Sequence, residues 1–354
     1  MKMRCAFACL ALACVQAVAA PEVRVVEIPG GGGVPDAETG ADGTIHLVWV
    51  KADDVWYAKS ADDGRTFSEP LRVNSEPGTA HPPNMFRGPD VAVGRDGMVH
   101  VIWYNNAFQR KRPKEEWGVN YARLETKTSA FTPTRNLNHL PSDGFSLAAN
   151  ERGQVAVIYM TGKVNLLTSR DDGETFAAPR EIAEADPCEC CASRAVFGAS
   201  GSLFMFYRDK AENVRDMFVI TDAPTAKDFT RNRLSTKPWQ IAGCPMTGES
   251  LTRAGNGFVA AWETKGQVSF ARLDASGKVS GTPEIEVAPR GKFPIALENG
   301  ASTVCVSWKE GTQLRWRLFD RDNRPLGELG SAPAPSGDRH AGVVTRAGDF
   351  VLFP

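Results

Sequence analysis

The sequence has almost no excess of charge and no block of basic residues. Its 41 Lys and Arg balance 42 Asp and Glu, for a formal net charge of −1. Proteins that bind nucleic acid through its phosphates usually carry a basic patch or run, so we expect no nucleic-acid partner. Beyond its first 20 residues the chain also lacks an apolar run long enough to span a membrane as a helix. Nucleic-acid binding and membrane spanning are therefore not expected.

The most pronounced apolar run lies at the N-terminus. A positively charged start and this run precede the small-residue segment Ala17-Val18-Ala19. The pattern predicts a secretory signal peptide over residues 1–20, with a mature chain that begins at Ala20 or Pro21. A retained anchor, or a lipoprotein signal that ends at Cys14, is the alternative. We expect an exported protein, periplasmic if the host is Gram-negative and otherwise secreted.

Cysteine is scarce in the predicted mature chain and unevenly placed. Three of the eight cysteines fall within the predicted signal. The others are Cys188, Cys190, Cys191, Cys244 and Cys305. An odd number in an oxidising compartment leaves at least one thiol free, metal-bound or paired with another chain. Cys305 lies in an apolar segment, and we expect it to be a small core residue.

A repeated pair of β-rich segments runs through the rest of the chain, at intervals of roughly 50 residues. Each pair has a short first segment, a turn with Gly or Asn, and an apolar second segment that often ends in an aromatic residue. The second segments are Ile45–Val50, Val99–Tyr104, Val155–Met160, Leu203–Arg208, Phe258–Glu263, Val304–Trp308 and Phe350–Phe353. The first segments begin near Ala37, Asp90, Ser146, Ser193, Ser250, Pro294 and Gly342.

These repeats predict an all-β propeller. One antiparallel unit cannot bury both faces of its sheet, so neighbouring units must stack, and a closed ring leaves only short edges. Seven first segments favour a single propeller of seven four-stranded blades over residues 21–354, with no second domain. Six blades with an irregular tail is the alternative. Because the last repeat ends after two strands, we expect the lone β-rich segment Val23–Ile28 to complete that blade and close the ring.

Two octapeptides, residues 60–67 and 169–176, share the pattern Ser-x-Asp-Asp-Gly-x-Thr-Phe. In a turn, the Asp side chain bonds backbone amides, Gly adopts positive φ and Phe anchors the loop from inside. The pattern resembles the Asp-box (BNR) repeat of sialidase-like propellers, a resemblance that covers nearly the whole mature chain. It implies that both boxes are structural and lie on the face opposite the ligand site.

Strand order then assigns the remaining loops to the other face of the ring. Loops that enter first strands should share that face with loops that join second to third strands. The loops concerned are 81–87, 105–117, 139–145, 186–194, 208–215, 243–249 and 339–340. The segments around 186–191 and 244–248 enter consecutive blades. Their four cysteines, Cys188, Cys190, Cys191 and Cys244, are therefore expected to gather at the mouth of the ring.

Three interpretations of this cysteine cluster remain open. Thiolates and the Met246 thioether are soft ligands suited to Cu(I), and four thiolates would also suit Zn²⁺. Met246 shares a side with Cys244 if that segment is extended. The second interpretation is a disulfide. Adjacent Cys190 and Cys191 have Cα atoms only about 3.8 Å apart, which favours a bond from Cys244 to one of the other three. Such a bond would leave two thiols close together on an exposed face. The third is a redox-active thiol pair.

The Cys-x-Cys-Cys and Cys-Pro-x-x-Gly segments also resemble a bacterial exported subgroup of the sialidase-like propellers, over roughly residues 186–250. That resemblance implies no particular activity. We expect a non-catalytic binding protein whose ligand is a metal, a small molecule or a glycan.

The alternative is a glycan-acting hydrolase of the exo-sialidase type. The resemblance implies that such an enzyme holds a substrate carboxylate with three Arg and uses a Tyr nucleophile paired with Glu and an Asp acid. Candidate ligand-binding residues are Arg87, Arg194, Tyr207, Arg208, Asp209 and Arg215, with Arg339 on the same face. The family's Arg-Ile-Pro signature is absent, and residues 86–89 match it only loosely. Tyr207 and Glu249 are the conceivable Tyr–Glu pair.

Overall fold

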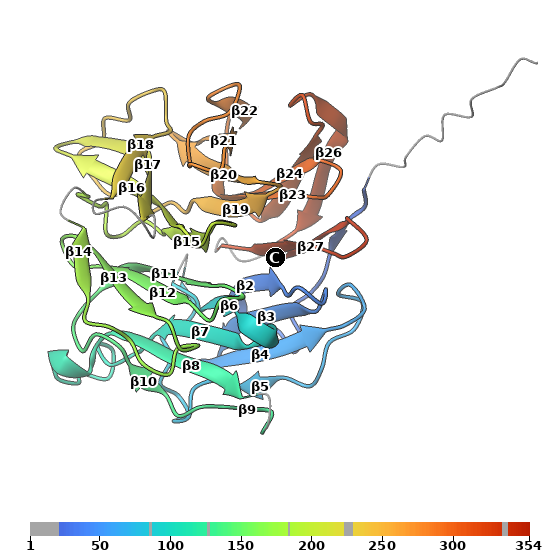
Figure 1. Cartoon of the computed structure of the whole chain (residues 1–354). Helices are drawn as coiled ribbons and strands as arrows, with labels where there is room; N and C mark the ends of the chain where they lie inside the picture. Colours follow the sequence, from blue (N-terminus) through green and yellow to red (C-terminus); the bar gives the residue numbers. More distant parts are fainter. Residues whose placement is uncertain (1–20, 85–86, 126–127, 183–184, 223–228, 335–338) are drawn as a thin grey trace, which may run out of the picture.

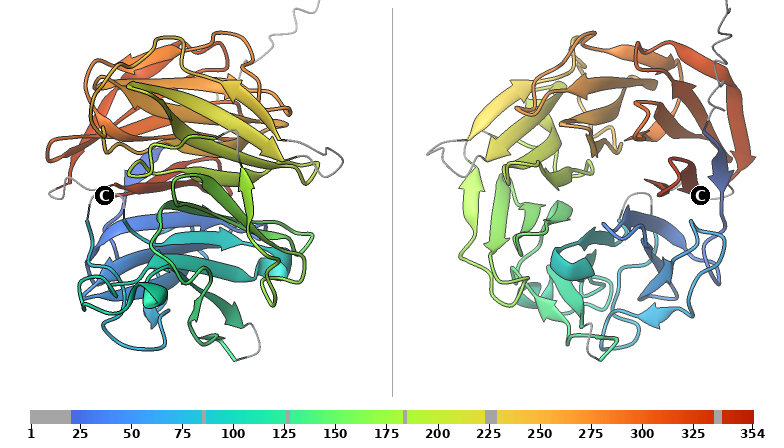
Figure 2. Two further views of the ribbon diagram at one scale, coloured as in Figure 1. Left: turned by 90° about the vertical axis from the view of Figure 1, so that its left-hand side faces the viewer. Right: turned by 45° about the vertical axis from the view of Figure 1, so that its right-hand side comes forward.

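The chain folds into a closed ring of seven β-sheets around a central axis (Figures 1 and 2). This computed structural model describes residues 21–84, 87–125, 128–182, 185–222, 229–334 and 339–354. The predicted signal peptide lies outside the described residues. Within the described residues there are two short 3-10 turns, Arg95–Gly97 and Lys114–Glu116, and no α-helix. No helix in this part of the chain is long and apolar enough to cross a membrane.

Six blades are antiparallel meanders of consecutive strands. The first holds β2 (Gly33–Thr39), β3 (Ile45–Lys51), β4 (Asp54–Ser60) and β5 (Leu71–Arg72). The second holds β6 (Asp90–Val93), β7 (Val99–Tyr104), β8 (Val119–Glu125) and β10 (Arg135–Asn136), with β9 (Ala130–Phe131) also paired to β8. The third holds β11 (Asp143–Ala149), β12 (Val155–Met160), β13 (Val164–Ser169) and β14 (Arg180–Ile182).

The next three blades follow the same order. The fourth holds β15 (Arg194–Phe197), β16 (Leu203–Ala211), β17 (Val214–Asp222) and β18 (Thr230–Arg233). The fifth holds β19 (Ser250–Ala254), β20 (Gly257–Thr264), β21 (Gln267–Leu273) and β22 (Ile285–Ala288). The sixth holds β23 (Lys292–Glu298), β24 (Val304–Glu310), β25 (Gln313–Phe319) and β26 (Pro325–Pro333).

The seventh blade is built from both ends of the chain. β27 (Ala341–Val344) and β28 (Phe350–Phe353) form a hairpin, and β1 (Val23–Val25) pairs parallel to β28. Val23 lies opposite Phe350, and the Val26 amide donates to the Leu352 carbonyl at 2.9 Å. The expected closure by the N-terminal segment and the seven-blade count are confirmed, and the six-blade alternative is wrong. The N-terminal strand covers an edge of β28 that would otherwise expose unpaired backbone groups.

Both faces of the inner strands pack against neighbouring blades. The aromatic residues near the ends of the second strands are fully buried, with 0–2% of their surface exposed: Trp49, Trp103, Tyr159, Trp262 and Trp308. One cluster joins Val48 and Tyr57 of the first blade to Val91 and Trp103 of the second. Alternate residues of a strand face opposite blades, which is why these segments are apolar throughout rather than alternating.

Both Asp boxes are hydrogen-bonded turns between the third and fourth strands of their blades, as predicted. Ser60 Oγ donates to Asp62 (2.7 Å) and accepts from the Gly64 amide (2.8 Å). Asp62 also accepts from the amide and hydroxyl of Thr66, at 2.9 and 2.6 Å. The box at 169–176 repeats each of these bonds. These hydrogen bonds lower the pKa of Asp62 well below its usual value and leave no open ligand role for the carboxylate.

The two box glycines offer a matched test of this turn. Gly64 and Gly173 have φ angles of 78° and 74°, where an alanine costs about 1–2 kcal/mol. A Cβ on Gly64 would make ordinary contacts with Val351, at 3.4 Å, and Ile45, at 3.6 Å, whereas a Cβ on Gly173 would overlap the Tyr121 hydroxyl. That buried hydroxyl is hydrogen-bonded to His100 Nδ1 at 2.8 Å. Gly173→Ala should therefore lower the free energy of unfolding by at least about 1 kcal/mol more than Gly64→Ala in urea titrations. Equal losses would contradict this account.

Candidate cysteine site

The loops that enter β15 and β19 meet on one rim of the ring. The Cys188 amide donates to the Arg208 carbonyl at 2.8 Å, which ties the first loop to strand β16. The Ala192 amide donates to the Thr247 carbonyl at 3.3 Å, which ties the first loop to the second. The expected gathering of the four cysteines at this rim follows from these contacts.

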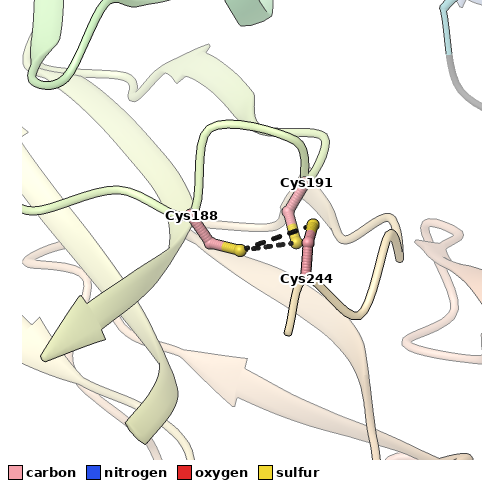
Figure 3. Close-up of side chains that lie close together, drawn as sticks. All are labelled: Cys188, Cys191 and Cys244. Atoms are coloured by element: carbon pink, nitrogen blue, oxygen red, sulfur yellow. Dashed lines mark hydrogen bonds between the residues drawn. The ribbon is translucent and has the colours of Figure 1, made fainter. Parts of the chain in front are cut away.

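The sulfur atoms of Cys188, Cys191 and Cys244 lie together where the loops meet (Figure 3), and Cys190 joins them through its bond to Cys244. Cys190 and Cys244 form a disulfide with a Cα–Cα distance of 6.6 Å. Cys188 Sγ lies 3.8 Å from Cys244 Sγ, and Cys191 Sγ lies 3.4 Å from Cys188 Sγ. The expected bond from Cys244 to one of the other three is thus present. In this state two thiols remain, so a four-thiolate zinc site is excluded.

The disulfide lies outside and the thiol pair lies beneath it. Cys190 and Cys244 reach solvent, whereas Cys188 and Cys191 are 3% and 0% exposed. The expectation that the remaining thiols would lie on an exposed face is therefore wrong. A tight turn, in which the Cys191 amide donates to the Cys188 carbonyl at 2.8 Å, folds both thiols under the loop.

The hydrogen bond between the two thiols and the charges around them give the two thiols different pKa values. The Cys191 thiol donates to Cys188, which lowers the pKa of Cys188 to about 7 against the opposing effect of burial. The Arg215 and Arg208 guanidiniums lower it further, and Glu249 raises it. The same hydrogen bond, together with burial, holds the pKa of Cys191 well above its usual value. Cys188 is the thiolate of the pair and Cys191 its donor.

Arg208 supports the site from within the core. It is 0% exposed, donates to the Glu263 carbonyl at 2.7 Å and lies 5.1 Å from the Trp239 ring. Glu249 is buried beside it, and burial raises the pKa of this carboxyl well above its usual value although Arg208 opposes the shift. Neither carboxylate oxygen of Glu249 has a hydrogen bond of normal geometry within the described residues. Arg208 is thus a positive charge behind the thiols rather than a side chain that a ligand can reach.

The other predicted arginines are engaged with acidic residues or backbone carbonyls. Arg87 pairs with Asp143 at 2.5 Å. Arg194 pairs with Asp36 at 2.6 Å and with Asp90 at 3.2 Å. Arg339 pairs with the same Asp90 at 3.0 Å, and Arg215 donates to the Glu212 carbonyl at 2.9 Å. The charges of Arg87, Arg194 and Arg339 are balanced within the protein, so these three do not form an open clamp for a substrate carboxylate.

The conceivable Tyr207–Glu249 pair does not form. The Tyr207 hydroxyl donates to Asp209 at 3.0 Å and accepts from Arg231 at 2.9 Å. Tyr207 belongs to a core cluster shared with the third blade. Glu249 interacts instead with Arg208, the next residue along β16, and adjacent strand residues point to opposite faces. Tyr207 and Asp209 therefore belong to a structural network on the other face of this sheet.

Met246 was expected to share a side with Cys244 only if their segment is extended, and the segment is not extended. No strand forms over 241–249, and Met246 has a φ of 47°, so the alternation of an extended segment does not apply. Another methionine, Met160 at the end of β12, is beside the cysteines. A Cβ built on Gly144 would meet both Met160 Sδ (2.5 Å) and the Cys191 carbonyl (3.2 Å).

A cleft of about 500 Å³ opens over the cysteines. Its lining comes from four of the loops assigned to this face, together with the end of β12: Pro141, Ser142, Asp143, Met160, Cys188, Glu189, Cys190, Lys210, Arg215 and Cys244. Sequence reasoning placed the loops 139–145 and 208–215 here but did not single out Asp143 or Lys210. Met160 was missed because its segment was assigned to the core of the ring.

No family model and no curated protein sequence matches this chain. A solved protein of unknown function from Dyadobacter fermentans aligns over 88% of this chain and 96% of that one, at 14% identity, with a TM-score of 0.53. A PL25 ulvan lyase bound to -[GlcA(1-4)Rha3S]- aligns over 88% and 87%, at 12% identity, with a TM-score of 0.55. NanB sialidase from Streptococcus pneumoniae aligns over 78% and 64%, at 10% identity, and its TM-score of 0.49 is too low to bear on function. At these identities the first two similarities show the fold alone. The chain has a seven-bladed β-propeller fold, as its repeats predicted.

The unequal thiols predict a measurable titration. The difference in thiolate absorbance between wild type and Cys188→Ser should rise as the pH is raised, with a midpoint near pH 7. Cys191→Ala should move the Cys188 midpoint upward, because the thiolate loses its hydrogen-bond donor. Since the pKa of Cys188 is lowered in the folded state, its thiolate adds stability at alkaline pH that is lost as the pH falls through about 7.

Cys305→Ser is the control for this titration, because Cys305 is buried in the core and its pKa is raised by burial. It should leave the midpoint unchanged. A midpoint at or above the ordinary thiol value of 9.0 would contradict the assignment of Cys188 as the thiolate.

Proposed function

We propose that the protein is an exported, non-catalytic binding propeller that takes one Cu(I) ion at Cys188 and Cys191. One observation carries the proposal: two thiols lie 3.4 Å apart beneath a disulfide and under an open cleft. A metal–sulfur bond is about 2.3 Å long, so one ion between two sulfurs can span up to about 4.6 Å. The sulfurs thus need only a small adjustment to share an ion.

The donor set favours Cu(I) over harder ions. Thiolate and thioether sulfur select soft metals, whereas Mg²⁺ and Ca²⁺ prefer oxygen. With the Cys190–Cys244 disulfide intact, only two thiols are available, too few for the four-ligand set of a structural zinc site. Reduction of the disulfide frees four thiols, and zinc is the alternative metal in that state. Met160 is better placed than Met246 to add a thioether ligand.

The surrounding charges suit a bound dithiolate. Two thiolates and one Cu(I) carry a net negative charge, and a buried charge is costly unless it is compensated. Arg208 and Arg215 both act on Cys188 and supply positive charge at the site. Their role here is electrostatic support of the ligands.

A Cu(I) titration against a chromogenic chelator, in metal-free protein with the disulfide intact, tests the proposal. Wild type should bind one equivalent. Cys188→Ser and Cys191→Ser should each lose at least about tenfold in affinity, since one of two thiolate ligands is removed. Met160→Leu should weaken binding less, and Cys305→Ser should match wild type. Equal binding by wild type, Cys188→Ser and Cys191→Ser would reject this site, as would no binding by wild type.

A glycan-acting protein is the second candidate. It is favoured by a cavity of about 580 Å³, lined by first-strand residues that include Asp36, Glu38, Arg194 and Thr252. This volume lies within the range of small-molecule sites. The ulvan lyase shares only the fold, and a shared fold does not carry an activity.

The exo-sialidase form of this second candidate can be tested through Arg194. Because Arg194 is held by two carboxylates, we expect no turnover of a fluorogenic sialoside by wild-type protein, with a rate equal to that of Arg194→Ala and of buffer. Hydrolysis by wild type that Arg194→Ala abolishes would instead support the hydrolase.

A further inference from the structure

We propose that the four cysteines form a thiol–disulfide exchange site, in which the buried Cys188–Cys191 pair passes its reducing equivalents to the surface Cys190–Cys244 disulfide. The external substrate would be a disulfide of a protein or of a small thiol. This activity goes beyond metal binding and requires no metal.

The geometry is a continuous row of sulfur atoms. Cys191 Sγ lies 3.4 Å from Cys188 Sγ, which lies 3.8 Å from Cys244 Sγ, which is bonded to Cys190. Thiol–disulfide exchange needs a thiolate next to one sulfur of a disulfide, and Cys188 occupies that place. Cys188 and Cys191 also have the Cys-x-x-Cys spacing found in redox-active dithiols.

The first step transfers the disulfide inward. The Cys188 thiolate attacks Cys244 Sγ, so that a Cys188–Cys244 bond forms, the Cys190–Cys244 bond breaks and Cys190 leaves as a thiolate. In the second step Cys191 loses its proton to the Cys190 thiolate and attacks Cys188 Sγ. A Cys188–Cys191 bond forms and Cys244 leaves as a thiolate. One disulfide and two free sulfurs are present before and after, so no external oxidant is consumed.

The burial pattern explains why such a relay is needed. Cys188 and Cys191 are 3% and 0% exposed, so a large disulfide substrate cannot reach them directly. After the two steps the dithiol lies at Cys190 and Cys244, which reach solvent. The Cys244 thiolate attacks the external disulfide and releases its first half as a thiolate, which takes the proton of Cys190. The Cys190 thiolate then attacks Cys244 in the mixed disulfide, so that the Cys190–Cys244 bond forms again and the second half leaves as a thiolate. The cluster is left with two disulfides and no thiol for a metal.

Disulfide mapping of the full chain tests the exchange. Metal-free protein, kept with a chelator, is equilibrated with glutathione and glutathione disulfide at several ratios, quenched with acid, alkylated and analysed by mass spectrometry. Wild type should show a Cys188–Cys191 bond with Cys190 and Cys244 alkylated, and a two-disulfide form in the most oxidising buffers. Wild type in which Cys190–Cys244 is the only bond at every ratio would overturn the proposal.

Two variants separate the steps. Cys191→Ser cannot complete the second step and should accumulate the Cys188–Cys244 bond. Cys188→Ser should retain only Cys190–Cys244, and Cys305→Ser should give the wild-type pattern. A Cys191→Ser protein without any Cys188–Cys244 bond would contradict the first step. Because the chelator removes metal throughout, the outcome is independent of the copper titration, and either proposal can fail alone.

Discussion

Every blade of this protein has two faces that must be covered, and only its neighbours can cover them. Trp103 and Trp308 are each 1% exposed because a second sheet lies against them. A single blade cannot bury both of its apolar faces by itself. Stacking around a ring satisfies all blades together, and it fixes which loops come out on which side. The position of the cysteine site is a result of this packing requirement.

The same requirement gives the site a rigid base. The two cysteine loops enter adjacent inner strands, β15 and β19, whose positions are set by their own sheets. Arg208 belongs to β16 and cannot move far, because its guanidinium is held between the Glu263 carbonyl and the Trp239 ring. The loops supply the reactive sulfurs, while the strands supply the buried charge. Chemistry on a loop and support from a strand is a common division in proteins whose scaffold is rigid.

Much of the fold was predictable because its determinants are local or periodic. The Asp boxes and the paired β-rich segments each specify a turn or a hairpin from their own residues. The meeting of Cys244 with the other cysteines also followed, since topology alone brings those loops together. The burial of Cys188 and Cys191 did not follow, because it depends on the Cys188 amide bonding the Arg208 carbonyl.

The pairing of the arginines was beyond sequence reasoning for a similar reason. Arg194 pairs with Asp36, which lies 158 residues away in the sequence, and no local sequence pattern identifies Asp36 as its partner. Met160 carried no distinguishing pattern, since a methionine at the end of an apolar strand is an ordinary core residue. Topology assigns a loop to a face, but side-chain contacts decide which of its residues are exposed.

The parallel pairing of β1 with β28 also sets an order of events. Six blades are meanders of neighbouring strands, so their contacts can form as the chain emerges. The seventh joins Val23 to Phe350 and depends on both ends of the chain. Contacts so distant in sequence form late, because the entropy of closing the loop must be overcome before the contact contributes. Until then the molecule is an open arc with two uncovered end faces. The arrival of β28 thus decides when β1 acquires its place, and the ring becomes a single cooperative unit only at that moment.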